Sequence, residues 1–300
     1  MKIVLTGSLG RINQTLVPQL TNNGHDVTVI SHQSSRSGLI KIFRATPAIG
    51  RLDDEAFLTR TFKGADVIYL MLTGVSASDD IYAAAKQQAE IYAAAIKAAG
   101  VKRVVNLSSV GADLGPEVGS LYMYHIIEQT LTAALPAVDL TFVRPTAMYY
   151  NLLTSVPTVR KSHRIYTNAS LDVKNVWVAP VDVTPVIIKA LTEPVIGQTV
   201  VYVASDEQTY LEVASALSKT LKMPDLRVSQ VPDEVMQDNL VTAGMPIAFA
   251  SEYVKTVAYQ RDHDFYADYR AHQPQLGDVK MADFAQVFAE DYHNQQIIKH

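Results

Sequence analysis

The chain has 300 residues, of which 48% are hydrophobic, a formal net charge of −4 at pH 7 and no cysteine. This length and apolar share suit a globular protein of one large or two smaller domains. The negative charge and the lack of basic clusters argue against a nucleic-acid-binding protein, and the missing cysteines exclude disulfides, thiolate metal ligands and cysteine nucleophiles.

Two features of the sequence bear on membranes and export. Only one lysine and a few apolar residues precede Thr6 and Gly7, which is too short for a signal peptide. No apolar run approaches the ~18–20 residues that a membrane-spanning helix requires. We therefore expect a cytoplasmic protein with neither a membrane nor a nucleic acid as its partner.

The N-terminal residues 2–13 read KIVLTGSLGRIN. A short β-branched run breaks at Gly7, Gly10 follows three residues later, and a helix-like pattern then begins. This layout is typical of a first strand, a tight glycine turn and a helix whose N-terminus can hold a pyrophosphate. The fingerprint is incomplete, because its third glycine position is Asn13.

Further strands and helices alternate along the chain. We expect a helix over 11–23, kinked or ended early by Pro18, and a long alanine-rich helix capped by Ser78 or Asp79 and stopped at Gly100. The other expected helices cover 53–62, 122–135, 182–191 and 209–221, and the strands 2–6, 26–31, 39–45, 67–72, 101–107, 139–143 and 199–204. Such alternation predicts an α/β fold with a doubly wound parallel sheet of the Rossmann type.

The rhythm of strand and helix loosens after Asn151. We therefore expect a dinucleotide-binding domain at 1–150 and a smaller, mixed C-terminal lobe at 151–300 for a substrate or a partner. Because ligands in such folds lie between the sheet and a later lobe, the segment 175–204 is expected to return to the first sheet.

Several stretches, in order, resemble the short-chain dehydrogenase superfamily. They are the turn at Gly7 and Gly10, NGHDV at 23–27, VVNLSS at 104–109 and TFVRPT at 141–146. Later stretches resemble its atypical, NmrA-like branch, namely 181–183, 209–214 and 231–234. The resemblance spans nearly the whole chain and implies a nicotinamide dinucleotide as cofactor.

The end of the second strand bears on which dinucleotide is bound. NAD-binding proteins of this kind carry an acidic residue there for the ribose 2′-hydroxyl, whereas this chain has Ser31. The missing carboxylate removes a repulsion against a 2′-phosphate, and Arg11 or Arg36 could supply a cation, although both could also be merely solvated. We expect NADP(H) rather than NAD(H).

The resemblance also implies where other cofactor contacts lie. Arg51 and Leu52 would flank the adenine, and the residues after the fourth strand would pass the ribose and phosphates. The complete set of expected cofactor-binding residues is Gly7, Ser8, Leu9, Gly10, Arg11, Ile12, Ser31, His32, Arg36, Leu52, Leu72, Thr73, Gly74, Ser108, Tyr124 and Pro145.

Superfamily members that oxidise alcohols use a serine followed by a Tyr-x-x-x-Lys pair, in which the lysine lowers the pKa of the tyrosine. The sole match, Tyr82 and Lys86, precedes the Ser108 strand and is attributed to chance on an alanine-rich helix. At the expected place the chain has Ser120 and Tyr124 instead. This undercuts alcohol dehydrogenation, sugar-nucleotide epimerisation and dehydration.

Hydride delivery to a quinone, azo compound or flavin needs less help from a protein acid. Tyr124 and His125 are the candidate catalytic donors, although His125 could simply pack on its helix. The expected acceptor-pocket residues are Tyr122, Ala147, Tyr149 and Tyr150. Two functions stay open: an NAD(P)H-dependent oxidoreductase that reduces a small acceptor such as a quinone, and a non-catalytic NADP(H) sensor with a protein partner.

Other chemistries find no support in the sequence. The Arg-Asp-His-Asp run at 261–264 lacks the one-turn spacing of helical metal ligands and is expected to be a solvated turn, so no metal site is expected. No Gly-x-Ser-x-Gly elbow occurs, and no pair of acids suggests hydrolysis.

Overall fold

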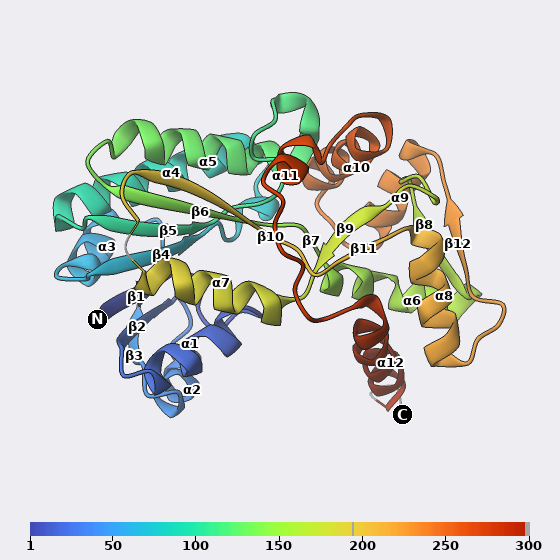
Figure 1. Ribbon diagram of the computed structural model, residues 1–300, viewed down its shortest axis with the longest axis horizontal. Helices are drawn as coiled ribbons and strands as arrows, with labels where there is room; N and C mark the ends of the chain where they lie inside the picture. The colour runs from blue at the N-terminus through green and yellow to red at the C-terminus, as the bar shows by residue number, and fades with distance from the viewer. Residues whose placement is uncertain (194, 298–300) are drawn as a thin grey trace.

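The computed structural model describes residues 1–193 and 195–297; positions 194 and 298–300, which fall in the predicted second lobe, lie outside the described residues. A large sheet flanked by helices forms one part of the molecule, and a smaller mixed region lies beside it (Figure 1). The candidate site belongs mainly to the first part.

The large sheet has seven strands, all paired in parallel, in the order β10-β6-β5-β4-β1-β2-β3. The strands are β1 (Lys2–Leu5), β2 (Asp26–Ser31), β3 (Thr46–Ile49), β4 (Val67–Met71), β5 (Arg103–Leu107), β6 (Asp139–Pro145) and β10 (Gln198–Val203). The order reverses between β1 and β4, which makes that junction the topological switch point where ligands bind in such sheets. The predicted Rossmann-type α/β fold is confirmed.

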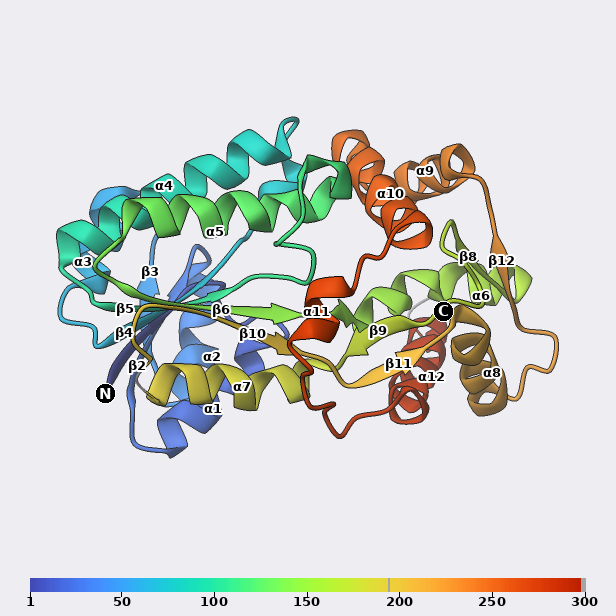
Figure 2. The ribbon, with the colours of Figure 1, turned by 45° about the horizontal axis from the view of Figure 1, so that its top comes forward.

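Helices cover both faces of this sheet (Figures 1 and 2). One face carries α1 (Asn13–Asn22), α2 (Ser37–Ile42) and α7 (Pro180–Thr192), and the other carries α3 (Glu55–Phe62), α4 (Ile81–Ala99) and α5 (Tyr122–Ala134). Two apolar cores result, one on each face. Burial on both faces explains why β4 reads as a continuous apolar run rather than an alternating one.

One local prediction on this part of the chain is wrong. The segment 39–45, expected as the third strand, is largely α2, whose Ile40 is buried in the core, and β3 begins only at Thr46. A short apolar run suits a strand or a buried helix turn equally, so periodicity cannot separate them. Pro47 is tolerated in β3 because that strand lies at the sheet edge. Of the two outcomes expected at Pro18, a kink or an early end of the helix, the early end does not occur, because α1 continues to Asn22.

The smaller region contains a three-stranded sheet of β7 (Ala147–Met148), β9 (Asn175–Val178) and β11 (Asp206–Gln208), and a parallel pair of β8 (Arg164–Thr167) and β12 (Arg227–Gln230). Its helices are α6 (Val156–Ser162), α8 (Tyr210–Leu221), α9 (Asp233–Thr242), α10 (Ile247–Asp262), α11 (Ala267–Ala271) and α12 (Met281–Ile297). In the segment 175–204, β10 pairs with β6 in the large sheet and α7 packs on one face of that sheet, whereas β9 belongs to the three-stranded sheet.

Short 3₁₀ turns connect these elements: η1 (Ser34–Arg36), η2 (Val75–Ala77), η3 (Pro116–Leu121) and η4 (Tyr149–Ser155). Within the described part of the chain, no helix combines the length and the apolar character needed to cross a membrane.

Candidate functional site

The turn between β1 and α1 demands a glycine at position 7. Gly7 has φ +83°, in the left-handed region, and a Cβ added there would lie 1.7 Å from the Sδ of Met71. Ser8 follows with φ 52° and donates its N–H to the carbonyl of Ile30 at 3.0 Å. Gly7 is therefore required both for the backbone conformation and for the close approach of β4.

Asn13 performs a specific task at the third glycine position. Its Nδ2 donates to the carbonyl oxygens of Thr6 at 2.8 Å and Ser8 at 2.7 Å, and the residue is 1% exposed. These bonds connect the first residue of α1 to both sides of the turn. Asn13, although it is not the usual glycine, therefore stabilises the turn between β1 and α1.

The N-terminal end of α1 offers free hydrogen-bond donors. No side chain caps this end, its first turn has no acidic residue, and the N–H groups of Arg11 and Ile12 have no acceptor among the described residues. Unpaired N–H groups at the positive end of a helix dipole favour an anion. The turn has the donors that a pyrophosphate requires.

A cavity of about 600 Å³ opens beside this turn, between the ends of β1–β4 and helix α4. The predicted cofactor residues among its lining are Gly7, Ser8, Ser31, His32, Leu52, Thr73 and Gly74. The size and position suit the adenosine half of a dinucleotide, so these residues fit the cofactor that the fold implies.

The cavity also has lining residues that were not among the predicted cofactor residues. Gln87 and Gln88 project from α4, and the Gln88 Oε1 accepts the Thr73 N–H at 3.2 Å. This polar pair interrupts the alanine-rich helix, which is the feature of the sequence that could have revealed it. Asp53 lines the cavity after β3 as well, next to Arg51, which the resemblance places beside the adenine.

The two arginines expected near the ribose do not line this cavity. The Arg11 guanidinium lies 4.9 Å from the ring centroid of Tyr150. The Arg36 Nε donates to Gln33 Oε1 at 3.4 Å on the exposed surface. The side chains of Leu9 and Ile12 are buried in the core on one face of the large sheet, and Leu72 packs against the core on the other face. These three residues could therefore contact a cofactor mainly through their backbone atoms.

Ser108 at the end of β5 belongs to a buried network. Its Oγ donates to Glu128 Oε1 at 2.5 Å, and Arg144 donates to the same carboxylate through Nε at 2.9 Å and Nη2 at 2.6 Å. Burial alone would lower the pKa of Arg144, but the bonds to Glu128 raise it above its ordinary value. Ser108 is therefore engaged in fixing α5 to the sheet, and the Pro145 carbonyl beside it accepts the Val110 N–H at 3.0 Å.

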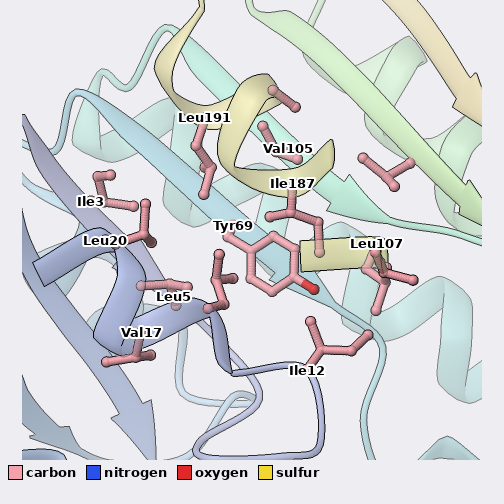
Figure 3. Close-up of a cluster of buried hydrophobic side chains, with 14 of the residues drawn as sticks. Ile3, Leu5, Ile12, Val17, Leu20, Tyr69, Val105, Leu107, Ile187 and Leu191 are labelled. Atoms are coloured by element: carbon pink, nitrogen blue, oxygen red, sulfur yellow. The ribbon is translucent and has the colours of Figure 1, made fainter. Parts of the chain in front are cut away.

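Three phenols gather near the turn. Burial raises the pKa of Tyr124 to about 12, and nearby Tyr150 adds to the effect. Burial likewise raises the pKa of Tyr69 on β4, and the phenols of Tyr150 and Tyr124 act in the same direction. Figure 3 shows Tyr69 among apolar side chains, its hydroxyl on the side of Ile12 and Leu107, and this hydroxyl has no partner among the described residues. Burial raises the pKa of Tyr150, and Arg11 opposes that shift.

The remaining predicted residues lie away from this group. His125 Nδ1 is 3.0 Å from the carbonyl oxygen of Ala112, and its ring stacks on Tyr122 with 5.1 Å between centroids. Tyr149 is 1% exposed and stacked between Trp177 and Phe284, in the core against which Ala147 also packs. Tyr149, expected to line the acceptor pocket, therefore packs as a core residue of the smaller region.

The Tyr82 and Lys86 pair has a structural explanation. The Tyr82 hydroxyl donates to Glu252 Oε2 at 2.5 Å and to the Gly119 carbonyl at 3.0 Å, which connects α4 to α10 and η3. Lys86 lies 4.0 Å from Glu90 instead. In the described part of the chain, no group of three His, Cys, Asp or Glu side chains could hold a metal ion.

The parallel sheet, its switch point and the glycine turn together define a Rossmann-type α/β protein. The profile of the NmrA-like family matches residues 1–291, and the chain belongs to this family.

Known proteins similar to the chain include reductases. The chain is 26% identical over 263 residues to a (4-alkanoyl-5-oxo-2,5-dihydrofuran-3-yl)methyl phosphate reductase of Streptomyces griseus, covering 86% of this chain and 87% of the relative. Among solved structures, the NADPH-dependent quinone oxidoreductase of Escherichia coli complexed with NADPH is 19% identical with a TM-score of 0.75, covering 95% and 99% of the two chains. The triphenylmethane reductase of Citrobacter sp. complexed with NADP(H) is 17% identical with a TM-score of 0.76, also covering 95% and 99%.

Proposed function

We propose that this protein is an NADP(H)-dependent oxidoreductase that reduces a small acceptor such as a quinone. The observation that carries the proposal is the glycine turn: Gly7 and Ser8 line a cavity of about 600 Å³, and the Arg11 and Ile12 N–H groups of the same turn have no acceptor among the described residues. Ser31 at the end of β2 adds no carboxylate to repel a 2′-phosphate. The reductases among its relatives, two of them structures with NADPH or NADP(H), support the same class.

When bound, NADP(H) supplies a hydride, and the chain's own residues bind, orient and protonate. The Arg11 and Ile12 N–H groups hold the diphosphate. With a quinone as acceptor, the cofactor would supply the hydride, and Tyr124 would supply the phenolic proton that completes the hydroquinone. Tyr124 would then recover its proton from water before the next turnover. A pKa of about 12, raised by burial, keeps Tyr124 protonated before the proton transfer.

His125 is proposed as a second donor with a different role in the fold. Its Nδ1 is within hydrogen-bond distance of the Ala112 carbonyl, which favours the tautomer that leaves Nε2 without a proton. In that tautomer Nδ1 is occupied within the fold, so a contact between His125 and the acceptor would have to come through Nε2.

One observation favours a second function, a dinucleotide sensor without catalysis. Ser108 is engaged by Glu128, and the tyrosine and lysine of the usual proton-transfer pair are replaced by Ser120 and Tyr124. A protein of this kind would bind NADP(H) and change its contact with a protein partner, with no turnover.

The experiment has two stages. Nicotinamide fluorescence is followed while the protein is titrated with NADPH and NADH, and NADPH oxidation is then measured by absorbance with a panel of quinones and azo dyes. We expect NADPH to bind more tightly, a quinone to be reduced, and Tyr124→Phe to lower kcat with a matched control, Tyr166→Phe in β8, unchanged. Binding without oxidation would favour the sensor, and binding of neither dinucleotide would exclude both functions.

A further inference from the structure

The backbone after β3 brings residue 51 to the end of β2. Ser31 pairs with Ile49 in the sheet, and the Gly50 N–H donates to the Ser31 carbonyl at 3.0 Å. Arg51 therefore leaves β3 beside Ser31 and His32. In this fold the end of β2 is where the ribose 2′ group of a dinucleotide is recognised.

Arg51 is a cation on the wall of the cavity itself. Among the described residues that line the cavity, it is the sole lysine or arginine. Arg11, by contrast, lies over the ring of Tyr150, and Arg36 contacts Gln33 on the surface. A 2′-phosphate at the Ser31 end of the cavity would thus meet Arg51 first.

Asp53 engages the Arg51 guanidinium through two parallel bonds. The Nε donates to Oδ1 at 2.8 Å and Nη2 donates to Oδ2 at 2.5 Å, and the two side chains are 76% and 53% exposed. Exposed ion pairs contribute little to stability, so the guanidinium can change partner at small cost. A phosphate monoester carries about −1.5 to −2 charges near neutral pH, more than a carboxylate.

We propose that Arg51 binds the 2′-phosphate of NADP(H) and sets the preference for NADP(H) over NAD(H), with Asp53 holding the guanidinium until the phosphate replaces it. The planar guanidinium fork matches two phosphate oxygens as well as it matches the Asp53 carboxylate. NADH offers no group for this exchange, so the pair stays closed when NADH binds. The inference rests on the proposed cofactor, but it does not require that the protein be catalytic.

The test measures dissociation constants by fluorescence titration and calorimetry, without turnover. Arg51→Gln should weaken NADPH binding by about 10- to 100-fold, the range for losing charge-assisted hydrogen bonds, and leave NADH within about 2-fold. Asp53→Asn, which removes the competing charge, should tighten NADPH binding severalfold. Arg60→Gln on α3 is the matched control and should change neither constant.

A fragment pair isolates the phosphate from the rest of the cofactor. Wild-type protein should prefer 2′,5′-ADP over 5′-AMP, and Arg51→Gln should lose that preference, while Arg51→Lys, which keeps the charge without the fork, should be intermediate. If NADPH and NADH both bind but Arg51→Gln leaves their ratio unmoved, or Arg36→Gln removes the preference instead, the role of Arg51 is refuted and the proposed function stands. If wild-type protein binds neither dinucleotide, both fail.

Discussion

Replacing Asn13 with glycine would restore the usual fingerprint of the turn, and the structure predicts that the change is harmful. The Asn13 Nδ2 bonds to the carbonyls of Thr6 and Ser8, at 2.8 and 2.7 Å, would both be lost in a buried place. Of the bonds between the turn and α1, the one from Gln14 Nε2 to the Leu9 carbonyl at 3.1 Å would remain. We expect both the free energy of unfolding and the affinity for NADPH to fall in Asn13→Gly.

The magnitude follows from these contacts. A typical hydrogen bond contributes about 0.5–1.5 kcal/mol net, and glycine in a helix costs roughly 0.5–1 kcal/mol more than alanine. The Asn13 Oδ1 is buried with no partner among the described residues, so its removal offsets the loss by raising the free energy of unfolding by about 1 kcal/mol or more. The balance is a destabilisation of about 1–3 kcal/mol.

Urea unfolding followed by circular dichroism measures this difference, and NADPH titration measures the affinity. Trp177 lies in the core of the smaller region, so its fluorescence checks whether both parts unfold together. Asn13→Ala separates the hydrogen bonds from the glycine penalty and should lose less stability than Asn13→Gly. An Asn13→Gly protein that is as stable as wild type and binds NADPH as tightly would refute the role given to Asn13.

Three further predictions follow from the same geometry. Gly7→Ala should lower the free energy of unfolding in urea by about 2–4 kcal/mol and abolish NADPH binding, because position 7 has a positive φ and a Cβ there would clash with Met71 Sδ. The double variant with Met71→Ala should recover only part of the lost stability. An unaffected single variant would contradict the turn geometry. Glu128→Gln should lower the free energy of unfolding by about 2–4 kcal/mol, because it breaks the buried ion pair with Arg144. The loss should be toward the lower end of the range for such pairs, since Asp268 still lies 3.1 Å from Arg144. A change within experimental error would mean that the pair of Glu128 and Arg144 adds nothing to stability. Since burial raises the pKa of Tyr124 to about 12, this group should stay protonated, and kcat with a quinone should show no basic limb due to Tyr124 between about pH 6 and about pH 9; a limb near neutral pH that disappears in Tyr124→Phe would show that its pKa is lowered instead.

The alternation of strands and helices was predictable because it depends on local patterns. The glycine at 100 ends α4, and Thr209 with Glu212 forms a capping box that begins α8, as their residue types suggest. The structure of the segment 39–45 was not predictable, because its few apolar residues fit a strand and a helix turn equally. What decides there is packing of Ile40 against the core, which no short sequence window contains.

The parts of the site that depend on backbone conformation were predictable from the sequence, and the contacts of its long side chains were not. Gly7 is forced by its φ and by Met71, and the strand order follows from the alternation. Arg11 could equally have reached the ribose, and its contact with Tyr150 depends on where η4 lies in space. Tyr149 and Tyr150 are adjacent in sequence, yet one is in the core of the smaller region and the other lies near the turn.

We infer that the turn at Gly7 holds the diphosphate of a nicotinamide dinucleotide. A crystal structure of the protein grown with NADPH tests it most directly. We expect diphosphate oxygens about 3 Å from the N–H groups of Arg11 and Ile12, with the adenosine in the cavity beside Arg51. A dinucleotide bound away from this turn, or crystals that take up none at saturating NADPH, would contradict it.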